Sequence, residues 1–143
     1  MARFKKWRGK EVTQQVAKNV AAALGEFALR AERYSKKELQ KGHGVLTGTL
    51  RRSIHTAQPG YQWLGDSSGA GERGGKFVEA LIKGKNITVQ LGSGLVYALA
   101  IHQGWPSGYK RMKGSFEGFH FLTKGVDKAK PELPAVLRKH QLK

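Results

Sequence analysis

The stretch EVTQQVAKNVAAALGEFALRAERYSKKELQK, residues 11–41, decides the fold of this chain. Apolar residues recur in it at intervals of three to five positions: Val12, Val16, Val20, Leu24, Phe27, Ala31, Tyr34 and Leu39. This spacing predicts one long amphipathic helix, roughly 45 Å in length, whose apolar side chains face a core. The opposite face, which we expect in solvent, carries Lys18, Glu26, Arg30, Arg33 and Lys37. Gly42 and Gly44 end the helix.

The segment after this helix predicts a short helical turn followed by strands. Thr47 is suited to cap a turn over residues 47–54, with Leu50 and Ile54 facing the core and Arg51 and Arg52 facing away. Residues 54–57, 61–64, 77–82 and 86–91 are strand-like, and Gly84 and Lys85 suit a hairpin turn between the last two. The alternation of apolar and polar residues over 86–91 is typical of a half-buried antiparallel strand.

The second half of the chain predicts two loops and two helices. Residues 65–76 hold five glycines and predict a flexible hairpin loop, and residues 106–118 form a second loop. Residues 95–105 predict a short helix that Gly104 ends. Residues 123–142 predict a final helix, which Pro131 and Pro134 make irregular.

These elements predict an α+β fold, in which a long N-terminal helix and a C-terminal helix pack on a small antiparallel β-sheet, with long Gly-rich loops. We expect residues 1–10 to form a basic N-terminal arm and residues 11–143 to form a single domain. The chain has 143 residues, which is the size of one domain.

The charge of the chain limits its function. It has 26 Lys and Arg against 10 Asp and Glu, a formal net charge of +16, so the function must include an acidic partner. No apolar stretch approaches the roughly 20 residues of a membrane span, and we expect no membrane partner. The chain has no cysteine, which excludes disulfides, cysteine-bound metals and a thiol nucleophile.

Catalytic and cofactor motifs are absent from the sequence. The glycine-rich stretch 65–76 lacks the Gly-Lys-Ser/Thr ending of a phosphate-binding loop and leads into a strand. His102 and His120 flank glycine and aromatic positions, but the five histidines lack metal-ligand spacing. The serines form no nucleophile elbow. We therefore expect neither an enzyme nor a cofactor, and no catalytic or metal site.

Nonspecific binding of nucleic acid is one hypothesis that fits the charge. Basic clusters occur at residues 3–10, 36–52, 110–113 and 124–143, some of them beside aromatic residues. Such clusters suit phosphate contacts and base stacking. No helix-turn-helix, zinc-finger or RNA-recognition motif specifies a sequence.

Three further pieces, taken in order, carry a family resemblance. The first is Thr47-Gly48-Thr49-Leu50-Arg51-Arg52-Ser53-Ile54 after the long helix. The second is Val89-Gln90-Leu91-Gly92-Ser93-Gly94-Leu95-Val96-Tyr97-Ala98, which leads to His102-Gln103-Gly104. The third is Phe119-His120-Phe121-Leu122 before the last helix. From about Val12 to Leu137 the chain resembles the siphophage neck and tail-component proteins typified by gene product ten of a lambdoid phage.

The resemblance implies a structural subunit of a tailed-phage virion, assembled in the bacterial host cytoplasm and placed at the neck. Such tail completion or head-tail joining proteins form a ring, of six or twelve copies, around the DNA channel. The implied partners are further copies of the chain, connector or stopper proteins, and tube or terminator proteins. Contact with packaged double-stranded DNA is also implied. A tail terminator that caps the tube is the alternative within this class.

Two groups of residues follow from these patterns. The candidate assembly residues lie in the termini, the loops and the basic turn: Phe4, Trp7, Arg8, Arg51, Arg52, Arg73, Lys76, Trp105, Tyr109, Lys110, Arg111, Lys113, Phe116 and Arg138. The residues expected to fix the fold are Thr47, Gly48, Leu50, Ile54, Gly92, Gly94, Tyr97, Gly104, Phe121 and Leu122. Among them, Leu50, Ile54, Tyr97, Phe121 and Leu122 are expected in the core.

Overall fold

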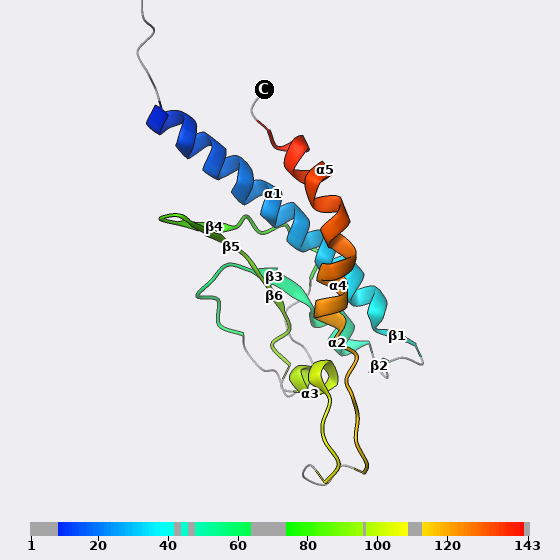
Figure 1. Ribbon diagram of the computed structural model, residues 1–143. Coiled ribbons are helices and arrows are strands. Elements are labelled where there is room, and N and C mark those ends of the chain that lie inside the picture. The colour runs from blue at the N-terminus through cyan, green and yellow to red at the C-terminus, as the bar shows by residue number, and fades with distance from the viewer. Residues whose placement is uncertain are drawn as a thin grey trace, which may run out of the picture.

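A computed structural model describes residues 9–41, 44–45, 48–63, 74–95, 97–108 and 113–141. The helices are α1 (Gly9–Glu38), α2 (Thr49–Ser53), α3 (Ala98–Gln103), α4 (Phe121–Ala129), the 3₁₀ turn η1 (Lys130–Glu132) and α5 (Leu133–Lys139). The strands are β1 (Gln40–Lys41), β2 (Gly44–Val45), β3 (His55–Ala57), β4 (Leu81–Lys83), β5 (Asn86–Thr88) and β6 (Gln90–Gly92). The predicted combination of a long N-terminal helix, a C-terminal helix and small antiparallel pairs is confirmed (Figure 1).

The helix α1 has 30 residues and begins at Gly9, inside the stretch expected to be an arm. Its buried positions are mostly small and begin only at Ala21: Ala21, Ala23, Gly25, Ala28, Ala31, Glu32 and Ser35. The expected core positions Val12 and Val16 are instead 49% and 43% exposed. The residues of the core-facing stripe are small because the backbones of other segments of the chain pass directly over them.

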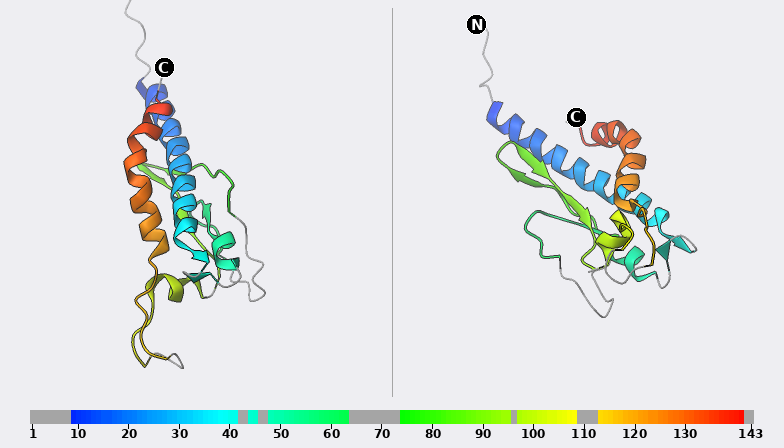
Figure 2. Two further views of the ribbon diagram at one scale, coloured as in Figure 1. Left: turned by 90° about the vertical axis from the view of Figure 1, so that its right-hand side faces the viewer. Right: turned by 60° about the horizontal axis from the view of Figure 1, so that its bottom comes forward.

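The helices α4 and α5 return along α1, as Figures 1 and 2 show. Contact with α4 is close: a Cβ added at Gly125 would lie 2.0 Å from Ser35 Oγ and 2.8 Å from Ala31 O. The predicted C-terminal helix begins earlier than expected, at Phe121, and ends at Lys139. Pro131 and Pro134 lie in or beside η1, where the helix changes to 3₁₀ geometry.

The strands form separate pairs rather than one sheet. β4 and β5 make the predicted hairpin, with Gly84 and Lys85 at its turn. The predicted strand 86–91 is broken at Val89, because β5 pairs with β4 whereas β6 pairs with β3. Residues 61–63 and 77–80 lie outside the strands, contrary to expectation, while β1 and β2 form a short parallel pair.

Residues 74–80 cross over α1 and then contact β3. The N–H of Ala80 donates to Ala21 O at 3.2 Å. A Cβ added at Gly25 would lie 2.5 Å from Val78 O, so glycine is required where this backbone meets the helix. Directly after β3, the side-chain amide of Gln58 donates to Glu79 O at 2.9 Å. This segment therefore ties the strands to α1.

The hydrophobic core joins the end of α1 to α2, α3 and α4. It consists of Leu39, Leu50, Ile54, Leu95, Ala98 and Phe121. Leu50, Ile54 and Phe121 are buried as predicted, and Leu122 is partly buried against them. Tyr97 was expected in the core but is 42% exposed, at the N-cap position of α3.

Two glycine predictions are resolved at helix ends. α2 has Gly48 at its N-cap, with φ of 77° and no side-chain cap, so the cap is not Thr47 as expected. Thr47 itself lies outside the described residues. Gly104 ends α3 as predicted, with φ of 82° and its N–H bonded to Ala100 O. Within the described segments, no helix combines the length and apolar character needed to cross a membrane.

Candidate assembly surfaces

Three of the predicted basic residues gather where residues 74–76 meet α2. Arg51 and Arg52 are exposed on α2. Lys76 is also exposed and lies two residues after Gly74. The N–H of Gly74 donates to Arg52 O at 3.1 Å, which brings the two segments together. We call Arg51, Arg52 and Lys76 the basic patch.

A buried carboxylate holds this junction. Glu32, only 2% exposed, accepts hydrogen bonds from Lys36 Nζ and from the N–H of Gly75, both at 2.6 Å. Gly74 has no room for a side chain, since a Cβ there would lie 2.1 Å from Ile54 O. The end of the glycine-rich loop is thus anchored to α1, which holds the basic patch at the surface.

The predicted aromatic pair of the second loop forms its base. Trp105 and Phe116 exchange two backbone hydrogen bonds of 2.8 Å, and their ring centroids are 4.8 Å apart. Phe116 also packs on Phe119, at 5.0 Å between centroids. Trp105 and Phe116 are therefore partly buried and support the base of the loop. Lys113, which lies between them in the sequence, is exposed.

A pocket of about 460 Å³ lies along β6. Its lining consists of Trp63, Gln90, Leu91, Gly92, Ser93, Ala98, Leu99, His102, Phe121 and Leu122. Successive residues of a strand face opposite sides, so a pocket lined by the four successive residues 90–93 follows the strand's edge. Among the described strands β6 pairs only with β3, which leaves this edge open. We call this feature the edge pocket.

The rim of the edge pocket is apolar and exposed. Leu99 is 64% exposed, and Tyr97 beside it is 42% exposed. Gly92 lies against Trp63, because a Cβ there would meet the indole ring at 3.4 Å. Gly94 follows β6 in the irregular segment that leads to α3. Most of the pocket lining is apolar, and Gln90, Ser93 and His102 are its polar members.

The histidine pair noted in the sequence supports one wall of this pocket. His120 has φ of 47°, and its N–H donates to His102 O at 2.9 Å, which joins α3 to the start of α4. The His102 ring packs edge-on against Phe121, and its Nδ1 accepts the Leu122 N–H at 3.4 Å. Burial, and then the neighbouring His120, lowers the pKa of His102. The pair is structural and favours an uncharged His102.

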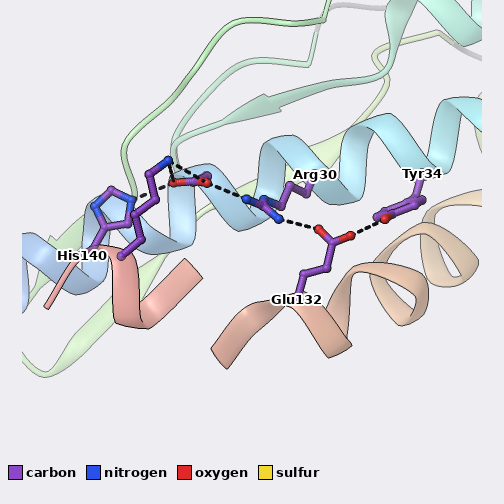
Figure 3. A network of polar contacts seen from close by, with 6 residues as sticks. Arg30, Tyr34, Glu132 and His140 are labelled. Carbon is purple, nitrogen blue, oxygen red and sulfur yellow. Dashed lines mark hydrogen bonds and ion pairs between the residues drawn. The ribbon is translucent and has the colours of Figure 1, made fainter. Parts of the chain in front are cut away.

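A polar network joins α1 to α5 at the other end of the molecule (Figure 3). Glu26 accepts hydrogen bonds from Arg30 at 2.9 Å, His140 at 2.8 Å and Lys139 at 3.2 Å. The bond from His140, followed by that from Arg30, lowers the pKa of Glu26 to about 2. Glu26 and Arg30 were expected on a solvated face, but they lie at a helix contact.

Glu132 forms the second half of this network. It accepts hydrogen bonds from Tyr34 Oη and, at 2.8 Å, from Arg30. The bond from Tyr34, then that from Arg30, lowers the pKa of Glu132, while the same carboxylate raises the pKa of Tyr34 and of Arg30. Arg30 thus bridges Glu26 and Glu132. This network fastens η1 and the end of α5 to α1, and it adds to the burial of Val136 on α5.

The remaining predicted residues are placed only in part. Arg138 is exposed on α5, where its Nε donates to Pro134 O at 3.3 Å. The others lie outside the described residues: Phe4, Trp7, Arg8, Arg73, Tyr109, Lys110 and Arg111. The part of the chain with described structure holds no group of three His, Asp or Glu side chains arranged to bind a metal.

Sequence reasoning missed the edge pocket and most of the polar network. Trp63, Leu91 and Leu122 are far apart in the chain, and no local pattern brings them together. The Glu26–Arg30 pair was visible as an i,i+4 spacing, but Arg30 and Glu132 are 102 residues apart.

Comparison with known proteins gives no family for this chain, because no family model, curated protein or solved structure matches it.

Proposed function

We propose that this protein is a structural subunit of a tailed-phage virion, a neck or tail-completion protein whose ring joins the tail to the DNA-filled head. The proposal originates in the three sequence pieces that resemble this family. It is supported by the surfaces that the fold leaves uncovered. The observation that carries it is a pair of unlike strand edges, each beside exposed apolar side chains.

One of these edges belongs to β6 and includes the edge pocket, with the exposed Leu99 in its lining. The other belongs to β4, which among the described strands pairs only with β5. Near it, Phe77 is 54% and Ile82 is 39% exposed. Contact between two unlike surfaces of identical subunits is head-to-tail, and it closes into a ring when the rotation allows. Strand addition supplies directed hydrogen bonds for such a contact.

The charges on the described surface favour an acidic neighbour. Glu26, Glu32, Glu38, Asp127 and Glu132 all form ion pairs within the chain. The basic patch stays exposed, so the subunit presents positive charge outward. Docking against acidic virion proteins, or against the DNA in the channel, compensates that charge.

The ring is tested by native mass spectrometry and electron microscopy of the purified protein, alone and mixed with tails that lack it. Leu99→Asp places a charge at the rim of the edge pocket and is expected to abolish the ring. Gln103→Asp adds the same charge to an exposed position of the same helix and is the matched control. A protein that stays monomeric under all these conditions contradicts the proposal.

Nonspecific nucleic-acid binding is the second candidate, and the basic patch is the observation that favours it. In that case duplex DNA binds tightly at low salt, and the affinity falls steeply as salt rises, because counterions are released. Arg51→Glu would weaken this binding without affecting a ring. Steep salt dependence together with a strictly monomeric protein would replace the virion proposal with this one.

A further inference from the structure

The first third of α1 has no cover from the rest of the described fold. No residue before Ala21 is among the buried residues of the helix. Val12, Val16 and Val20 recur every four residues and so share one face of the helix. Val12 and Val16 are 49% and 43% exposed. This part of α1 therefore presents a largely exposed apolar stripe, whose end at Val16 and Val20 lies across a hollow from Leu137 of α5.

The stripe leads into a groove between α1 and α5. A hollow of about 370 Å³ lies there, lined by Val16, Asn19, Val20, Leu137, His140 and Gln141. Leu137 contributes from α5 and is 37% exposed. Both walls of this helix groove are helical, and its floor is mostly apolar.

Positive charge borders the helix groove on its α5 side. Glu26, which bonds the lining residue His140, is already bonded to Arg30 and Lys139 as well. Arg138 and Lys139 follow the lining residue Leu137 in the chain, and both are exposed. The side chain of Lys139 is 66% exposed even while it contacts Glu26. The border of the groove thus keeps a surplus of positive charge.

We infer that the helix groove is the docking site for an acidic amphipathic helix of another protein. An apolar stripe with a four-residue repeat, beside a second helix, fits the apolar face of a third helix. Carboxylates on the flanks of that helix complement Lys139 and Arg138. A second copy of this chain is a poor occupant, because it brings a further charge of +16. The inference rests on the proposed function, for which it specifies the chemistry of the neighbouring virion protein.

The probe is a fluorescein-labelled peptide of about 18 residues, roughly five helical turns, with leucines on one face and glutamates elsewhere. Its binding to the full chain is followed by fluorescence anisotropy. A scrambled peptide of the same composition, which has no apolar face, is the control ligand. We expect the amphipathic peptide to bind at least about tenfold more tightly than the scrambled one, since only it buries leucines in the groove.

Two substitutions in the protein locate the site. Val16→Asp removes the apolar floor at an exposed position, and it is expected to weaken the peptide about tenfold or more. Gln103→Asp adds the same charge at an exposed position of α3, away from the groove, and is expected to leave the affinity unchanged. Circular dichroism and thermal unfolding establish that both variants keep the fold.

Each other outcome overturns the inference. Equal binding of the two peptides means that charge alone attracts them. An unchanged affinity for Val16→Asp places the peptide elsewhere, and an absence of binding removes the site. Loss of the ring in Val16→Asp would make a second copy the occupant. Ring formation in this variant is scored separately, so the ring proposal stands or falls independently of the groove.

Discussion

Three basic side chains bond to the carboxylate of Glu26, and these bonds make the attachment of α5 to α1 dependent on pH. Arg30 comes from α1 itself, whereas Lys139 and His140 come from the end of the chain. The ordinary pKa of this carboxyl is 4.5, and in the folded protein it is about 2. A lowered pKa means that the ionised form stabilises the fold above pH 4.5, and that this stabilisation is lost as the pH falls toward 2.

We therefore expect acid to loosen α5 through Glu26. Between pH 6 and pH 3 the thermal midpoint of the protein should fall further than that of Glu26→Gln, by about 3 °C or more. The variant should also be less stable at pH 6. Circular dichroism melts of both proteins measure the difference. Parallel falls in the two proteins would mean that other carboxyls determine the acid response.

Glu32 permits a second prediction for a single residue. Glu32→Gln keeps the shape of the side chain but removes its charge, and so weakens the bonds to Lys36 and to the Gly75 N–H. A charge-assisted bond of this kind contributes about 1.5–3 kcal/mol. Hydrogen exchange at Gly75 should accelerate, whereas the exchange at Ala80, whose N–H donates to Ala21, should not. Equal acceleration at both amides would indicate general destabilisation instead.

Single core residues were predictable where a local pattern selected them. Leu50 and Ile54 lie four apart beside two arginines, and Phe121 and Leu122 form an apolar pair, so their inward direction followed from the sequence. Tyr97 was misplaced because a tyrosine next to apolar residues does not reveal that the chain turns before α3. No pattern in the sequence indicated that Lys139 and His140, near the end of the chain, would bond to Glu26.

At the scale of elements, small residues set the distance between α1 and its neighbours. Gly125 on α4 faces Ala31 and Ser35, and Gly25 faces the backbone of Val78. The sequence predicted α1 correctly but assigned its large apolar residues to the core. The large side chains did not indicate the buried face of α1. This helix packs close to the backbones of its neighbours, which requires alanine, glycine and serine at the contacts. The strand at residues 86–91 was predicted as one element because the change of partner at Val89 depends on β3.

The contact of α1 with α4 can be tested with one methyl group. Gly125→Ala places a Cβ within 2.6 Å of Ser35 N, which is backbone and cannot rotate away. We expect the helices to separate and the free energy of unfolding to fall by about 1–3 kcal/mol. Urea unfolding measures the loss. Thr123→Ala, at an exposed position of the same helix, should change the stability little.

At the scale of the whole molecule, carboxylates are used in ion pairs within the chain, and this bears on the proposed assembly. The described ion pairs engage acidic side chains within the chain, and the net charge of the whole chain is +16. Composition alone predicted an acidic partner but not the surfaces. The edge pocket and the helix groove each combine segments from distant parts of the chain, so only the folded arrangement reveals them.

In the proposed ring, mutual repulsion of the positively charged subunits predicts the response to salt. Added salt screens like charges, with a Debye length of about 10 Å at 0.1 M. The fraction of protein in rings should therefore rise between about 0.02 M and about 0.3 M salt. Mass photometry or light scattering measures it, with Leu99→Asp as the variant that stays monomeric. A ring population that falls with salt would mean that opposite charges hold the copies together.

The pairing of α1 with the last helices also affects the synthesis of the protein. Arg30 leaves the ribosome 102 residues before its partner Glu132. At translation rates of about 5–20 residues per second, that interval is about 5–20 s. During this time the stripe from Ala21 to Ser35 lacks the helix that covers it, so α1 emerges first but completes its packing last. A slow codon cluster just before α4 would prolong the time for which this stripe is uncovered and open to aggregation.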